Sequence, residues 1–182
     1  FANAPVKVVP NCVTDAMLAD GRRAVSVCGS DKYRIASFLS WTTFKNVRLA
    51  LKAFRDVRKT FPAAEYHLVG PGLEQDGPCH RWAAGNGMTT GVFFHGRLAH
   101  ADALDCIRRC DVVFHPSREE SFGNPLSEGM ALGRVVVAGR NSGGCAWVLD
   151  EGRAGYLVDV TSVPDMARVL IAEDEPDLMK AL

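Results

Sequence analysis

The sequence lacks a long apolar run, an internal repeat and an excess of charge. No apolar stretch approaches the ~20 residues that a helix needs to cross a bilayer. Lys plus Arg balance Asp plus Glu at 21 each, so no overall field attracts nucleic acid or anionic lipid. The chain begins at Phe1 and shows no charged-then-apolar leader. We therefore expect a cytoplasmic piece of a longer polypeptide that contacts no nucleic acid and shows no membrane contact of its own, with peripheral membrane association through the missing part left open.

Metal-binding and phosphate-loop signatures are also lacking. The six cysteines include no Cys-x-x-Cys pair and no zinc spacing. No Gly-x4-Gly-Lys-Ser/Thr segment occurs, which excludes a P-loop. Buried free thiols in a reducing compartment are the favoured interpretation of the cysteines. His80 and His115 are interpreted as structural histidines rather than as ligands or bases. We expect neither metal nor cofactor.

Short β-branched runs alternate with amphipathic stretches along most of the chain. The predicted strands are Tyr33–Leu39, Glu65–Val69, Val92–His95, Cys110–Phe114, Val135–Ala138 and Gly155–Val158. The predicted helices are Asn46–Phe61, with Asn46 as a candidate N-cap, Pro78–Asn86, Ala101–Cys110, Pro125–Leu132, a short one at Ala146–Leu149 and a last one from Pro164. This order predicts an α/β fold with a Rossmann-like, doubly wound parallel sheet. One domain of 182 residues can bury roughly 70% of its unfolded surface.

The first 31 residues show no clear periodicity. We interpret residues 1–31 as a linker and edge segment, with a short strand at Val6–Pro10 and an additional edge strand at Ala24–Cys28. Residues from Asp15 onward in this segment are polar and have no helical pattern.

Polar side chains crowd into the stretch from His115 to Gly133, where a buried strand gives way to a helix. Asn124 before Pro125 is the preferred order for an N-cap and a first helical residue. The amides of Phe122, Gly123 and Asn124 would then lie at the positive end of the helix dipole, with Gly123 allowing close backbone approach. That arrangement suits a phosphate.

A known family has the same motifs. Pro116-Ser117, followed by Glu120-Ser121-Phe122-Gly123 and then Glu128 after seven residues, resembles the Glu-x7-Glu motif of GT-B retaining glycosyltransferases of the family four type. The segments Gly133–Ala138 and Ser142–Gly144 are similar to two further segments of that family. The resemblance implies the C-terminal half of a GT-B fold: residues 1–182 would form the nucleotide-sugar-binding domain, and the N-terminal acceptor domain would lie outside this sequence.

The resemblance also implies a role for individual residues. Glu120 would accept hydrogen bonds from donor-sugar hydroxyls, and Glu128 from the ribose. Lys45 would bind the diphosphate. The backbone of Ser121, Phe122, Gly123 and Asn124 would hold sugar and phosphate, and Arg97 and Leu98 would lie in the loop that contacts the base. We expect Lys45 and Glu120 to be the catalytic pair.

The glycine-rich turn Gly70-Pro71-Gly72 follows a predicted strand. As a dinucleotide motif it lacks the third glycine, whose place Gln75 takes, so a turn with backbone constraints is the favoured interpretation. The family nevertheless has a glycine-rich turn here that faces the donor.

Two positions depart from the family pattern. Ser40 stands where the family usually has an Arg, and one lost charge-assisted hydrogen bond weakens phosphate binding about ten- to a hundredfold unless Arg97 or Arg118 substitutes. Trp147 stands where a Glu is common, and there we expect packing rather than chemistry.

The resemblance implies transfer of a hexosyl group from a nucleoside diphosphate sugar to an acceptor hydroxyl, with the anomeric configuration kept. The acceptor, a glycan or a lipid, would be bound by the missing N-terminal domain, so this piece alone should bind rather than catalyse. Two alternatives remain open. One is a degenerate, non-catalytic nucleotide-sugar-binding module, and the other is a GT-B nucleotide-sugar epimerase.

Overall fold

The computed structural model of the protein describes residues 10–23 and 32–172. Its strands are β1 (Arg34–Phe38), β2 (Glu65–Val69), β3 (Val92–Gly96), β4 (Val112–His115), β5 (Val135–Gly139) and β6 (Tyr156–Val158). Its helices are α1 (Asp15–Arg23), α2 (Val47–Thr60), α3 (Pro78–Gly85), α4 (His100–Arg109), α5 (Asn124–Ala131), α6 (Cys145–Val148), the 3₁₀ turn η2 (Asp150–Gly152) and α7 (Val163–Ala172).

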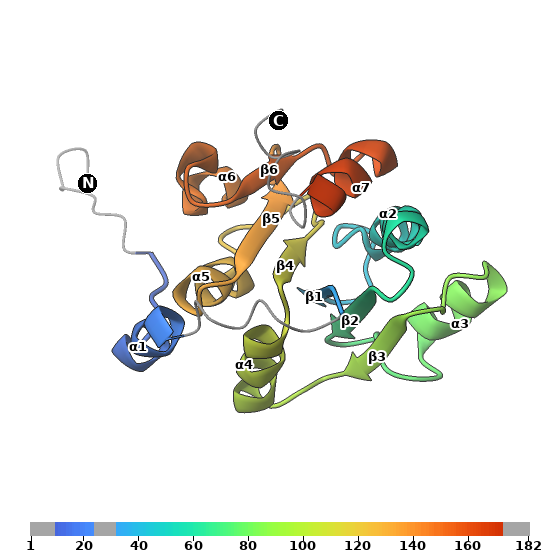
Figure 1. Cartoon of the computed structure of the whole chain (residues 1–182), viewed down its shortest axis with the longest axis horizontal. Helices are drawn as coiled ribbons and strands as arrows, with labels where there is room; N and C mark the ends of the chain where they lie inside the picture. The colour runs from blue at the N-terminus through green and yellow to red at the C-terminus, as the bar shows by residue number, and fades with distance from the viewer. Residues whose placement is uncertain (1–9, 24–31, 173–182) are drawn as a thin grey trace, which may run out of the picture.

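All six strands join one parallel sheet in the order β3-β2-β1-β4-β5-β6. Helices α2, α3 and α7 cover one face of the sheet, and α1, α4, α5 and α6 cover the other (Figure 1). The central strands β4 and β5 are therefore buried on both sides, which explains why they appear in the sequence as apolar runs, whereas the edge strand β3 leaves Phe93 exposed. The predicted doubly wound α/β fold is confirmed.

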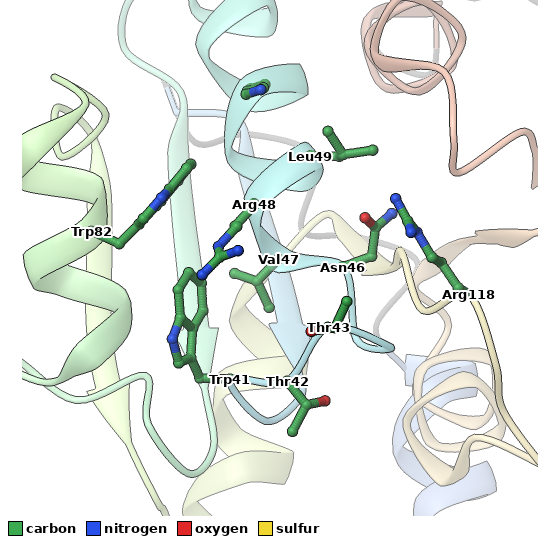
Figure 2. A pocket seen from close by; sticks show the side chains of 10 residues that line it. Trp41, Thr42, Thr43, Asn46, Val47, Arg48, Leu49, Trp82 and Arg118 are labelled. Carbon is green, nitrogen blue, oxygen red and sulfur yellow. The ribbon is translucent and has the colours of Figure 1, made fainter.

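Helix α2 begins at the loop that leaves β1, and Asn46 does not cap it as the sequence predicted. Asn46 occupies the N-cap position, but its backbone is left-handed (φ 58°) and its side chain makes no capping hydrogen bond. Instead its Nδ2 donates to the carbonyl oxygens of Pro116, at 3.1 Å, and Val160, at 2.7 Å. Asn46 thus points toward the loop that follows β4, where Arg118 lies (Figure 2). This buried amide joins three loops at one end of the sheet.

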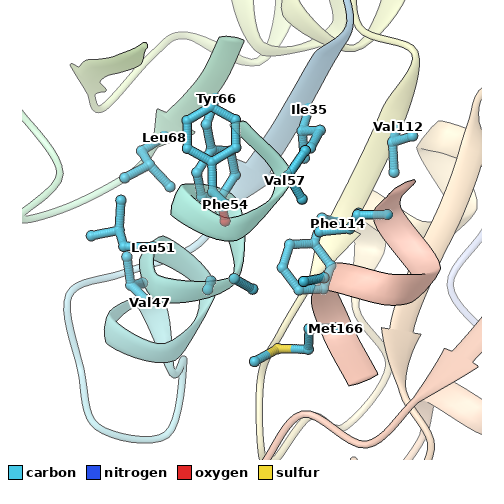
Figure 3. Close-up of a cluster of buried hydrophobic side chains, with 14 of the residues drawn as sticks. Ile35, Val47, Leu51, Phe54, Val57, Tyr66, Leu68, Val112, Phe114 and Met166 are labelled. Carbon is cyan, nitrogen blue, oxygen red and sulfur yellow. The ribbon is translucent and has the colours of Figure 1, made fainter. Parts of the chain in front are cut away.

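The larger apolar core lies between the sheet and helices α2 and α7. Ile35, Tyr66 and Phe114 project from neighbouring strands onto Phe54 and Met166 (Figure 3). On β1 and β4 the alternate residues Ala36 and Val113 face the opposite core, because side chains alternate across a sheet. Two cores on a rigid sheet hold the loops at its carboxyl edge in place.

Residues 15–23 form helix α1, so the linker interpretation is wrong for this part of the chain. Met17 is buried against α5, and Gly21 lies so close to Ala131 that an added Cβ would stand 2.0 Å from its carbonyl oxygen. Asp20 pairs with Arg108 of α4 at 3.0 Å. The strands expected at Val6–Pro10 and at 24–28 lie outside the described residues, apart from Pro10, which belongs to no strand.

Candidate functional site

The strand order reverses direction between β1 and β4. From β1 the chain proceeds to β2 on one side, and from β4 it proceeds to β5 on the other. The loops that leave the carboxyl ends of these two strands therefore diverge, and this switch point is the usual ligand position in open α/β sheets. Lys45 lies in the loop after β1, and Glu120 lies in the loop after β4.

The Glu120 carboxylate in the loop after β4 has three hydrogen-bond donors around it. Lys45 Nζ lies 2.6 Å from Oε2, and His115 Nε2 lies 3.0 Å from the same oxygen. The backbone N–H of Ser121 donates to Oε1 at 3.1 Å. Because an ionised carboxylate only accepts hydrogen bonds, His115 Nε2 must carry a proton. The predicted pair of Glu120 and Lys45 is thus brought together.

His115 is a site residue that the sequence interpretation left aside as structural. It ends β4, is 2% exposed, and its Nδ1 contacts no polar group in the part of the chain that the structure describes. Its only sequence signal is its place, directly before the Pro116-Ser117 segment. The structure gives it a definite partner, the Glu120 carboxylate.

These donors lower the pKa of Glu120 from 4.5 to about 2, and the hydrogen bond from His115 contributes most, followed by Lys45. A carboxyl whose pKa is depressed in the folded state adds stability above its unfolded pKa. That stability is lost as the pH falls from about 4.5 toward 2.

We therefore expect Glu120→Gln to lower the free energy of unfolding by about 1–2 kcal/mol at pH 7, allowing for solvent screening, and by less at pH 3. Urea unfolding at a series of pH values measures the difference. Glu119→Gln is the control, because Glu119 is exposed and forms no ion pair within the described chain. A loss that is as large at pH 3 as at pH 7 would contradict this assignment.

The Gly143-Gly144 segment supports the Glu120 loop from behind. Gly144 N–H donates to the Glu120 carbonyl oxygen at 2.9 Å. An added Cβ on Gly143 would lie 2.3 Å from that oxygen, and one on Gly144 would lie 2.1 Å from the carbonyl oxygen of Ser121. Only glycine permits this approach of two backbones. These contacts explain why two glycines occupy positions 143 and 144.

The N-terminus of α5 lies next to Glu120, but Asn124 does not cap it as expected. Asn124 is the first helical residue and Gly123, with φ 79°, is the N-cap. The Asn124 Oδ1 instead accepts from Asn11 Nδ2 at 2.7 Å. The amides of Phe122 and Gly123 donate to no group among the residues described, so they remain available to an anion.

Glu128 lies one turn into α5 and pairs with a second unforeseen histidine. Its Oε1 lies 2.8 Å from Nε2 of His100, the first residue of α4. Arg97 and Leu98 come just before this histidine; Arg97 is exposed and Leu98 is half-buried. The structure therefore places Glu128 against the start of the helix that follows the predicted base-contacting loop. No sequence signal pointed to His100.

The turn at Gly70 and Gly72 is constrained by the neighbouring β1 loop. An added Cβ on Gly70, whose φ is 135°, would lie 1.7 Å from the Leu39 carbonyl oxygen, and one on Gly72 would lie 2.7 Å from Trp41 Cβ. Trp41 N–H donates to the Pro71 carbonyl oxygen at 2.9 Å. These two glycines are needed for the close packing of this turn against the β1–α2 loop.

The prediction for Trp147 is only partly met. Its ring centroid lies 6.1 Å from that of Phe122, yet the side chain is 56% exposed. It projects from the short helix α6 instead of filling a core, because its helix has only four residues and Cys145 takes the buried position.

Within residues 10–23 and 32–172, no three His, Cys, Asp or Glu side chains are grouped so that they could hold a metal ion. In the same residues, no helix has the length and apolar character required to cross a membrane.

Residues 34–172 match the model of the family described as Glycosyl transferases group 1. A phosphatidyl-myo-inositol mannosyltransferase from Mycolicibacterium smegmatis is 34% identical over 138 residues, which are 75% of this chain. Those residues are only 34% of that enzyme, so the chain spans about a third of this curated relative.

Two solved structures show the same fold. LpcC from Francisella tularensis, described as the C-terminal domain of a glycosyl transferase group 1 family protein, has a TM-score of 0.66 at 21% identity, covering 91% of this chain and 86% of that one. HepE from Anabaena, in complex with UDP-glucose, has a TM-score of 0.66 at 24% identity, covering 91% of this chain and 44% of that one. With its six-stranded parallel sheet and its match over residues 34–172, this chain belongs to the glycosyl transferases group 1 family and has the Rossmann-like fold of GT-B glycosyltransferases.

Proposed function

We propose that this chain is the donor-binding domain of a retaining glycosyltransferase and that it binds a nucleoside diphosphate sugar at the switch point between β1 and β4. The observation that carries the proposal is the Glu120 carboxylate, held beside Lys45 and next to unpaired amides at the start of α5. A carboxylate suits vicinal sugar hydroxyls, and amides at a helix N-terminus suit a phosphate. The UDP-glucose bound by HepE supports this class of donor.

Glu128 would hold the ribose at the other end of the donor. Glu128 lies in α5, eight residues after Glu120. Its partner, His100, is the first residue of α4. The base would then lie toward Arg97 and Leu98, and Gly70 and Gly72 would face the donor from the adjacent loop. In this arrangement the nucleotide extends from β4 toward β3.

In the proposed reaction the hexosyl group moves to an acceptor hydroxyl, and the charge of the leaving diphosphate is stabilised by Lys45 and the amides of residues 122–124 without a metal ion or cofactor. Lys45 must be shared, however, because it already pairs with Glu120. Ser40, where the family usually has an Arg, adds no charge, so we expect weak diphosphate binding by this chain. The acceptor, a glycan or a lipid, would be bound by an N-terminal domain of the whole protein, in the cytoplasm.

The two glutamates provide the test. Glu128→Ala should weaken a nucleoside diphosphate and its sugar conjugate alike, by about ten- to a hundredfold, because both ligands carry the ribose. Glu120→Ala should weaken only the sugar conjugate, and it should leave diphosphate binding equal or tighter because Lys45 is released from its ion pair. Calorimetry with UDP-, GDP-, ADP- and dTDP-sugars and the corresponding diphosphates measures both effects.

Glu119→Ala is the matched control, since Glu119 is the exposed neighbour of Glu120. The same loss for both ligands in both glutamate variants would refute the assignment of roles. Absence of binding by all four diphosphates and their sugars at millimolar concentration would refute the donor site itself.

A further inference from the structure

A cavity of about 340 Å³ opens beside the candidate site, between the β1–α2 loop, the first turns of α2, and α3. Two indole rings, those of Trp41 and Trp82, form one side, and Arg118 approaches from the other (Figure 2). Lys45, His115, Glu120 and Glu128 are not among its lining residues. The cavity is therefore separate from the proposed donor site, although it shares the β1–α2 loop with it.

The charged residues that line this cavity all have the same sign. Arg48, Lys52 and Arg118 contribute three cations, and no Asp or Glu is present in the lining. Within the described part of the chain, none of the three forms a salt bridge, whereas Arg34, Arg55, Arg108, Arg153 and Arg168 each do. Three unneutralised cations around one cavity repel one another, and an anion would relieve that repulsion.

Arg48 is held in position by aromatic rings. Its guanidinium lies 5.1 Å from the Trp41 ring centroid and 5.6 Å from that of Trp82, and the two indoles are 5.9 Å apart. Such stacking fixes the plane of the guanidinium but leaves its N–H groups free to donate at the edge. Because little side-chain freedom remains to be lost on binding, Arg48 is preorganised for an oxyanion.

The opposite side of the cavity is fixed by buried hydrogen bonds. Asn46, 5% exposed, donates to the Pro116 and Val160 carbonyl oxygens, and the backbone N–H of Arg118 donates to the Phe44 carbonyl oxygen at 2.7 Å. The hydroxyl-bearing Thr42 and Thr43 lie between the two sides (Figure 2). The cavity thus offers two guanidinium groups, one ammonium, hydroxyls and two apolar ring faces on a rigid frame.

We propose that this cavity binds a phosphate group carried on a carbon body, that is, a phosphomonoester or phosphodiester. Arg48, Lys52 and Arg118 hold the phosphate oxygens, and the carbon body lies against Trp41 and Trp82. A guanidinium fork with a neighbouring ammonium matches phosphate in charge and in geometry. The site is distinct from that of the donor diphosphate, so this inference does not depend on the proposed function.

The test is a titration with glycerol 3-phosphate in the presence of excess UDP, which occupies the proposed donor site. Emission of Trp41 and Trp82 is followed in a Trp147→Phe background, so that the two cavity indoles are the tryptophans observed. We expect a saturable change, and Arg48→Gln should weaken it about tenfold or more. Arg48→Lys should keep part of the affinity because it keeps the charge.

Arg55→Gln is the matched control: Arg55 lies on the same helix but outside this cavity, so its loss should change the affinity by less than about twofold. Co-sedimentation with phosphatidylglycerol and phosphatidylcholine vesicles distinguishes the sources, since binding to the former alone, without a response to glycerol 3-phosphate, would assign the site to a lipid headgroup. Three results would overturn the proposal. They are no response in either arm, equal losses in Arg48→Gln and Arg55→Gln, or an Arg48→Gln variant that melts lower but binds unchanged.

Discussion

Replacing Gly144 by alanine is expected to lower the free energy of unfolding by about 2–3 kcal/mol and to displace the loop that carries Glu120. The added Cβ would stand 2.1 Å from the Ser121 carbonyl oxygen and 2.9 Å from its carbon. Both atoms belong to the backbone, so no rotamer change removes the clash. Separation of the two segments would also stretch the hydrogen bond from Gly144 N–H to the Glu120 carbonyl oxygen. Urea unfolding measures the loss.

Gly85→Ala is the matched control. Gly85 ends α3, and a Cβ built there meets nothing within 4 Å, so the same added methyl group should be neutral or slightly stabilising. If the two alanine variants unfolded at the same urea concentration, the contact between the Gly143-Gly144 segment and the Glu120 loop would not be a structural requirement. Donor binding, measured by calorimetry, should fall only in the Gly144 variant.

The sheet could be predicted from the sequence because each strand is a local signal. Runs such as Val112–Phe114 and Val135–Ala138 are β-branched, apolar and bounded by turn residues, and burial on both faces makes them continuous rather than alternating. Amphipathic stretches between them predicted right-handed crossovers, and hence a parallel sheet. The six strands predicted from Tyr33 onward lie within two residues of the observed ones.

Helix α1 could not be predicted because its stability comes from distant residues. The segment Asp15–Arg23 is polar on average, includes Gly21 and buries Met17 as its one fully covered apolar side chain. Its contacts are with α5 and with Arg108, more than 80 residues away. Without those partners, local propensity favours no helix here.

The capping hydrogen bonds predicted for Asn46 and Asn124 do not form, for a similar reason. An Asn before a helix normally caps it, since its side chain has no better local partner. Here Asn46 satisfies two buried carbonyl groups of other loops, and Asn124 pairs with Asn11. Tertiary hydrogen bonds replaced the local ones.

At the site, Glu120 and Lys45 could be found from motif spacing. The pairing of Glu128 with His100 joins residues 28 apart, and no sequence pattern indicates it.

The largest expected effect concerns sugar transfer itself. We expect the 182-residue chain to bind donor and to form no measurable glycosylated product. A protein extended to the length of its relatives should transfer sugar. In the proposed GT-B arrangement, the acceptor hydroxyl approaches the anomeric carbon from a second domain, and orientation of two bound reactants can supply about 7–11 kcal/mol of the barrier.

The measurement compares product formation by the short and the extended proteins with the same donor, and it includes Glu120→Ala and Glu119→Ala in the extended form. The Glu120 variant should lose about a hundredfold or more in kcat/KM, because the carboxylate that would hold the donor sugar also positions Lys45 at 2.6 Å. The exposed Glu119 should be dispensable. Product from the short chain at a rate comparable with the extended protein would show that residues 1–182 already contain the acceptor site, and that closure by a second domain is not needed for the reaction.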